Sequence, residues 1–81
     1  MENIELLDAI RAYYKRYPMG GSLHIVLDDG NTEAWHVQFA RDIAISNKDN
    51  EGVRLADRLL ELDDNQRISI YAALWKMRDA E

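Results

Sequence analysis

The chain has 81 residues, a formal net charge of −5, and 47% hydrophobic against 31% charged residues. This length leaves room for a single domain, residues 1–81, with one modest core rather than a deep substrate cleft. The chain contains no cysteine, which excludes disulfides, thiolate nucleophiles and zinc–thiolate sites and favours a reducing compartment.

The first predicted element is a helix over 3–17. At about 100° per residue, its apolar side chains fall on one arc and its charged side chains on the other. We expect Tyr14 and Tyr17 to pack in the core and Tyr13 to lie at its edge. A proline and two glycines within 18–21 end the helix.

Residues 22–28, with the sequence SLHIVLD, predict a short extended strand. Leu23, Ile25 and Leu27 recur with the period of two that is typical of a strand, and the segment includes β-branched side chains. An Asp-Gly pair follows directly, which is a common turn signal.

The segment 32–46 supports two interpretations. As a helix, it places Trp35 and Phe39 on one apolar stripe, and Asn31 can cap its first turn. As a strand, its residues up to position 39 alternate between apolar and polar, which predicts a β-hairpin over 22–39 through the Asp-Gly turn. The hairpin would pair backbone groups that a lone strand leaves open. The residue pattern leaves both interpretations open.

Two further helices are predicted, over about 50–62 and about 65–79. Asp63 or Asp64 can cap the second of these, with Gln66 at the far end of a capping box. The expected fold is therefore mainly α, a small α+β domain.

This expected fold has about four helices and one short extended strand at 22–28. The alternative fold is a β-hairpin over 22–39 packed on three helices. The two folds differ only in the structure of 32–46, because the other helices have an unambiguous helical period.

The last predicted helix carries apolar residues on two opposite faces. One stripe contains Ile68, Tyr71, Ala72 and Trp75, and the other contains Ile70, Ala73, Leu74 and Met77. A helix of this kind is either sandwiched between other elements or covered by another molecule. Because the first stripe holds the large aromatic residues, we assign it to the core. We predict that Ile70, Leu74 and Met77 contact a partner or a second copy.

Negative charge is concentrated in the middle of the chain. Residues 22–52 contain six acids against Arg41 and Lys48, so this region carries four of the five excess charges. Such a surface repels phosphate backbones, which disfavours direct nucleic-acid binding. It suits a basic protein surface, including one that normally holds nucleic acid. The predicted partner-binding residues here are Asp28, Asp29, Glu33 and Asp42; the alternative explanation of this charge is solubility alone.

Two histidines and two aspartates could ligate a divalent metal: His24, Asp28, Asp29 and His36. Zinc accepts nitrogen and oxygen donors, but the spacing of these residues matches no established motif. Turn and core roles account for each residue separately. We therefore predict no metal, no cofactor and no catalytic residue. A metal-dependent enzyme using His24 and His36 remains a lower-ranked alternative.

The segment GGSLHIVLDDGN at 20–31, followed by LADRLLELDDNQR at 55–67, resembles small proteins of bacteriophages and prophages that share a GGxLHIVLDDGN-like segment followed by helices. The resemblance implies a phage accessory protein and a helix over 32–46. It carries no assigned chemistry.

Resemblance and charge together lead to one leading hypothesis: the protein binds a host protein in the host cytoplasm, for example as an inhibitor of a defence or nucleic-acid-handling machine. A self-assembling homodimer is the alternative. The acidic first residues do not fit a secretory signal, and no apolar run reaches the length of a membrane span, so we expect a soluble, cytoplasmic protein.

Overall fold

The computed structural model describes residues 3–17, 21–23 and 33–80 of the chain. Within these ranges the backbone forms the helices α1 (Asn3–Arg16), α3 (Ala34–Ser46), α4 (Asn50–Glu61) and α5 (Asp64–Ala80). The described residues contain no strand, so the mainly α prediction is confirmed for them. None of these helices has the length and apolar character needed to cross a bilayer.

The structure decides between the two interpretations of 32–46. Residues 34–39 are helical, so the alternative hairpin over 22–39 is wrong. Ser22 and Leu23, the first residues of the predicted strand, form a turn, and the rest of that strand lies outside the described residues. The helical period prevails because it buries Val37 and two alanines against the core, which an alternating strand would not do.

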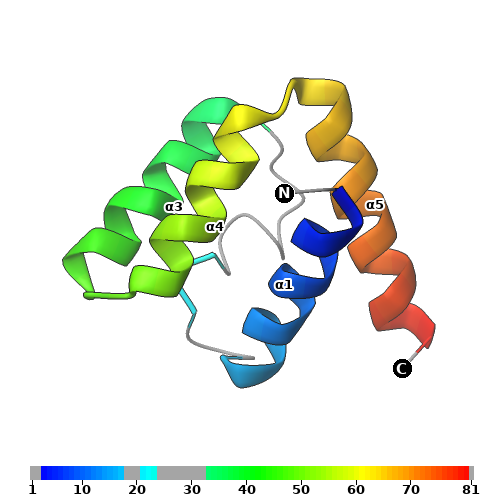
Figure 1. Cartoon of the computed structure of the whole chain (residues 1–81), viewed down its shortest axis with the longest axis horizontal. Coiled ribbons are helices and arrows are strands. Elements are labelled where there is room, and N and C mark those ends of the chain that lie inside the picture. The colour runs from blue at the N-terminus through cyan, green and yellow to red at the C-terminus, as the bar shows by residue number, and fades with distance from the viewer. Residues whose placement is uncertain (1–2, 18–20, 24–32, 81) are drawn as a thin grey trace.

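The helices surround one core (Figure 1). α3 and α4 lie side by side and are joined by a short turn, α1 packs against α4, and α5 packs on α1. The core is made of residues that are at most 8% exposed: Leu6, Ile10, Tyr13, Leu23, Val37, Ala40, Leu55, Ala56, Leu59, Ile70, Tyr71 and Leu74.

The tyrosines of α1 are arranged differently from the prediction. Tyr13 is 1% exposed and belongs to the core, Tyr14 packs against the core, and Tyr17 is 46% exposed. The rings of Tyr13 and Tyr17 lie 5.1 Å apart and tilted. Tyr13 shares one face with Leu6 and Ile10, which are seven and three residues before it, and this narrower stripe is the one that meets α4 and α5.

The α3–α4 turn is a Schellman motif. The Asp49 N–H donates to the Ala44 carbonyl at 2.8 Å, and the Lys48 N–H donates to the Ile45 carbonyl at 3.1 Å. Lys48 has a φ of 58°, the left-handed conformation that this motif requires and that glycine adopts most easily. Asp49 then caps α4 by accepting from the Gly52 N–H at 3.0 Å.

The α4–α5 corner is held by a capping box and a buried arginine. The Asp63 carboxylate accepts from the Gln66 N–H at 2.8 Å, and the Gln66 amide oxygen accepts from the Asp63 N–H at 3.0 Å, which confirms the predicted cap. Arg67 is 3% exposed. Its guanidinium donates to the carbonyls of Leu59 and Leu62 at 3.1 and 2.6 Å, so it satisfies backbone groups at the end of α4.

α5 buries a different face from the one predicted. Ile70, Tyr71 and Leu74 are 4%, 3% and 8% exposed, whereas Ile68 is 51% exposed. The buried face of α5 therefore contains residues from both predicted stripes. The reason is that α1 packs on α5 at a position between the two stripes and covers adjacent residues such as Ile70 and Tyr71. The side chain of Trp75, predicted to be a core anchor, lies outside the described part of the chain.

Candidate functional site

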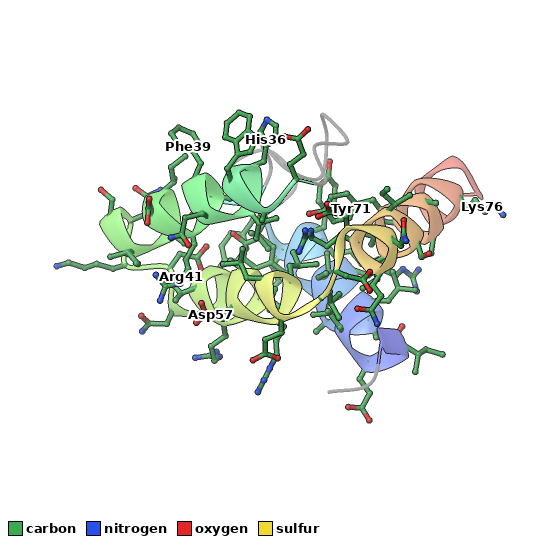
Figure 2. All side chains as sticks on the ribbon, turned by 90° about the horizontal axis from the view of Figure 1, so that it is seen from above. His36, Phe39, Arg41, Asp57, Tyr71 and Lys76 are labelled. Atoms are coloured by element: carbon green, nitrogen blue, oxygen red, sulfur yellow. The ribbon has the colours of Figure 1, made fainter. Side chains whose placement is uncertain are left out.

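The outer face of α3 carries two large exposed aromatic side chains. Trp35 is 63% exposed and Phe39, one turn later, is 53% exposed. Figure 2 shows Phe39 pointing outward from α3. Between α3 and α4 these rings border an open depression of about 400 Å³. We call this region the aromatic surface; its lining residues are Ala34, Trp35, Gln38, Phe39, Asp42 and Leu60.

Trp35 is held in place by its neighbours on the first turn of α3. Its indole N–H donates to the Glu33 carboxylate. On its other side the ring stacks on His36, with ring centroids 3.5 Å apart and an interplanar angle of 30°. The side chain therefore has a fixed orientation although most of its area faces solvent.

Glu33 occupies the N-cap position of α3 but makes no side-chain cap hydrogen bond. Its carboxylate binds the Trp35 indole instead. Asn31, the predicted cap, lies outside the described residues. The helix begins two residues later than predicted, at Ala34. The side chains that cap a helix are mainly those of serine, threonine, aspartate and asparagine, so α3 starts without a preferred cap and the Glu33 carboxylate is available to Trp35.

His36, on the same turn, has an unusual environment. Its Nδ1 atom is buried and has no hydrogen-bond partner among the described residues. Buried polar atoms are nearly always paired, and exceptions call for an explanation. The unusual features of α3, namely the exposed aromatic rings, the non-capping Glu33 and the unpaired His36 nitrogen, thus lie within its first two turns.

The charged groups around the aromatic surface are acidic. Glu33 and Asp42 are both exposed, and the Asp42 carboxylate accepts from the Gln38 amide at 3.1 Å. Arg41, which is the only lysine or arginine of α3, bonds to Asp57 of α4 at 2.5 Å, and Figure 2 shows these two side chains together beside α4. The rim of the surface therefore keeps an uncompensated negative charge within the described residues.

Two of the three residues of α5 that we predicted to contact a partner are buried in the core. Ile70 and Leu74 are part of the core, at 4% and 8% exposure, and the side chain of Met77 lies outside the described part. This corrects the assignment of Ile70 and Leu74 to an exposed face. The physical reason is that α1 covers the stripe, a possibility that the helical period of α5 cannot distinguish from a partner.

The acidic part of the predicted site is placed only in part. Asp28 and Asp29 lie outside the described residues, whereas Glu33 and Asp42 flank the aromatic surface. The charge pattern of the sequence predicted Glu33 and Asp42 as partner-binding residues, and that role stays a prediction. The helical interpretation of 32–46 placed the aromatic rings between them on one apolar stripe, and in the structure both rings are exposed.

The candidate metal cluster cannot be assembled from the described residues. His24, Asp28 and Asp29 fall outside them, and His36 stacks on Trp35. Among the described residues no group of three or more histidine, aspartate or glutamate side chains is arranged to hold a metal ion.

A buried polar network connects α1 with the start of α4. The Tyr13 hydroxyl donates to Asp49 at 2.6 Å and accepts from the Ser22 N–H at 2.7 Å. Burial, together with the hydrogen bond to Asp49, raises the pKa of Tyr13 to about 12. Burial alone would raise the pKa of Asp49, but hydrogen bonds from Tyr13, Gly52 and Ser22 outweigh it and hold that pKa below 3.8.

Glycines make room for this network. A Cβ at Gly21 would lie 2.8 Å from Cε1 of Tyr13, and a Cβ at Gly52 would lie 2.9 Å from Cγ of Asp49. Both distances are too short for a carbon–carbon contact. The network has every polar partner inside the chain, so it explains stability rather than binding.

A second groove runs between α1 and α4, with a volume of about 480 Å³. Ala9, Ala12 and Leu55 form its apolar part. Ion pairs within the chain cross or border it, namely Arg16 with Glu51 and Arg58 with Glu61. Because its rim charges are of both signs and largely paired internally, the groove offers less to a partner than the aromatic surface does.

The sequence held a signal for the aromatic surface. α3 is apolar on two sides, with Val37, Ala40 and Ala44 on one and Trp35 and Phe39 on the other. The same two-sided pattern occurs in the last helix, α5. The size of the residues does not indicate the buried face of α3, because its larger side chains are the exposed ones.

No protein-family model, no curated protein and no protein of known structure matches the chain. The function must therefore be inferred from the aromatic surface itself.

Proposed function

We propose that the protein is a binding module that associates with another protein through the aromatic surface. The observation that carries the proposal is the exposure of Trp35 and Phe39, 63% and 53%, one turn apart on the same face of α3. Fully burying a phenylalanine side chain contributes about 1.5–3 kcal/mol. In the free chain most of the area of these two rings stays exposed, so their burial contributes little to folding. Binding to a partner would bury them and gain this free energy.

The local design of α3 supports the proposal. Tryptophan is among the residues that contribute most to protein interfaces, especially where it is held in one orientation. Glu33 and His36 hold the Trp35 ring. Departures from ordinary design that gather at one place are typical of functional sites.

The partner we propose is a host protein with a basic surface. Glu33 and Asp42 give the aromatic surface a negative rim, which favours basic partners and repels nucleic acid. The resemblance to phage and prophage proteins suggests the setting, in which a small acidic protein occupies a basic, nucleic-acid-handling surface of the host and inhibits it. The inhibitory role is a separate proposal, which identification of the bound host protein would test.

The test compares the wild type with the double variant Trp35→Ala/Phe39→Ala. The matched control is Ile68→Ala, which removes an apolar side chain of similar exposure from α5. Each protein is immobilised, exposed to a lysate of its native cell, and the captured protein is identified, purified and titrated by calorimetry. We expect the double variant to lose binding while Ile68→Ala retains it. Equal affinity of all three proteins would contradict the proposal.

A further inference from the structure

The aromatic surface has a shape that indicates what covers it, and this inference rests on the proposed function. We infer that the partner element is a basic amphipathic helix, lying along the depression between α3 and α4, and that a second copy of this chain is not the occupant.

The shape of the surface favours a helix. The depression lies between α3 and α4, with Trp35 and Phe39 on one side and Leu60 of α4 on the other. A groove between two packed helices accepts the ridge of a third, with apolar side chains at helical spacing entering it. Its volume of about 400 Å³ fits a few apolar side chains, which a partner helix presents along one stripe.

Charge selects a basic helix. Glu33 lies at the beginning of α3 and Asp42 two turns further on, so carboxylates flank the aromatic pair on both sides. No lysine or arginine lines the depression. Lysine or arginine residues that flank the apolar stripe of the partner would meet these carboxylates at the rim.

The same charges argue against a second copy. In a twofold dimer the same patch meets itself, so rim residues face rim residues of the same kind. Glu33 and Asp42 of one chain would then approach the acidic rim of the other, and no basic group of the depression would offset the repulsion. A homodimer through this surface is therefore disfavoured at low salt.

The Glu33 carboxylate has a role in this arrangement that a structural residue would not have. It makes no cap bond to α3 and instead orients the Trp35 indole. A carboxylate has further lone pairs, so Glu33 can accept from a partner lysine while it keeps Trp35 in place. It connects the aromatic and the acidic parts of the surface.

The inference is tested with two synthetic peptides of about 18 residues, or five helical turns. Both have the same leucine stripe; one has lysines and the other glutamates beside it. Binding of each labelled peptide is measured by fluorescence anisotropy at low and high salt. We expect the lysine peptide to bind the wild type at least roughly tenfold more tightly, with the preference reduced by salt.

Two matched double variants show where the preference arises. Glu33→Gln/Asp42→Asn should remove most of it. Glu5→Gln/Asp8→Asn makes the same change in net charge at exposed positions of α1 and should leave it unchanged. An equal effect of the two pairs would show attraction to net charge alone and would overturn the inference.

Other outcomes separate this inference from the proposed function. If Trp35→Ala/Phe39→Ala abolishes capture of the native partner but both peptides bind equally or neither binds, the proposed function stands and the basic helix is wrong. If sedimentation finds a dimer that the same double variant dissociates, the occupant is a second copy. If the double variant still captures the partner, the proposed function itself fails.

A single substitution distinguishes a binding role of Glu33 from a structural one. Glu33→Ser places a good capping residue at the N-cap of α3 and releases Trp35. We expect a higher melting temperature together with weaker binding of the lysine peptide. Unchanged binding in this variant would show that Glu33 does not act in recognition.

Discussion

α3 and α4 pack side by side, but they differ in which of their side chains are buried. α4 buries Leu55, Ala56 and Leu59 and turns its charged residues to solvent. α3 buries only Val37 and two alanines and turns Trp35 and Phe39 outward. The helix with the larger apolar side chains thus contributes the smaller ones to the core.

The two helices also differ in how side chains cap their ends. α4 is capped at its start by Asp49 and at its end by Arg67, which reaches back from α5. α3 begins at Ala34, and the Glu33 side chain at its N-cap makes no cap hydrogen bond. The comparison indicates that α4 is the scaffold of the domain. α3 is held by α4 on one side, and this leaves its other side available for a partner.

The strongest test of this difference between α3 and α4 is to truncate one apolar residue on each helix. Leu59→Ala should lower the free energy of unfolding by about 3 kcal/mol, because Leu59 is fully buried and a cavity would remain. Phe39→Ala should change it by no more than about 0.5 kcal/mol. Urea denaturation measures both values. A comparable loss in Phe39→Ala would mean that the outer face of α3 supports the fold.

The next largest effect concerns the N-caps. Asp49→Ala removes the cap of α4 and the acceptor of the Tyr13 hydroxyl, so it should cost about 2 kcal/mol, about half from each. Glu33→Ala removes no cap and should cost no more than about 0.5 kcal/mol. Thermal melting of the two variants tests the difference. Equal losses would contradict the distinction between the helix starts.

A pH titration sharpens the role of Asp49. Its pKa is lowered in the folded state, so its ionised form stabilises the fold above about pH 3.8, and this contribution is lost as the pH falls toward the folded value. Asp49→Asn keeps a capping side chain but cannot ionise, and it should cost about 1 kcal/mol at neutral pH. The gap to the wild type, measured by urea denaturation, should narrow below about pH 3.8. A gap independent of pH would show that the charge of Asp49 is not involved.

The smallest predicted effect lies at the turn that joins the two helices. Lys48 has a φ of 58°, and Lys48→Gly should raise the free energy of unfolding by about 0.5 kcal/mol, because glycine adopts this conformation without strain. The control is Asn47→Gly, since Asn47 has a φ of −88°. It should give no gain in melting temperature. A gain in both variants would point to a cause other than the left-handed backbone.

Much of the helical framework was predictable from local pattern. The bounds of α1, α4 and α5 agree with the sequence to within a residue or two, and the capping box of Asp63 and Gln66 was recognised from spacing. These features depend on residues within one or two turns of each other, which sequence periodicity and capping rules describe directly. The charge of Glu33 and Asp42 was likewise evident from the sequence, whereas their role in binding a partner stays a prediction.

Which face of each helix is buried was decided only by the tertiary structure. Tyr13 rather than Tyr17 enters the core, Ile70 and Leu74 are covered by α1, and Trp35 is exposed. A helix that is apolar on two sides, such as α3 or α5, has a pattern that fits either face equally well. Which face is buried depends on which neighbouring helix packs against it and on how closely that helix approaches. Small residues such as Ala40 and Ala44 let α4 approach α3, and the large aromatic residues are thereby left on the outside.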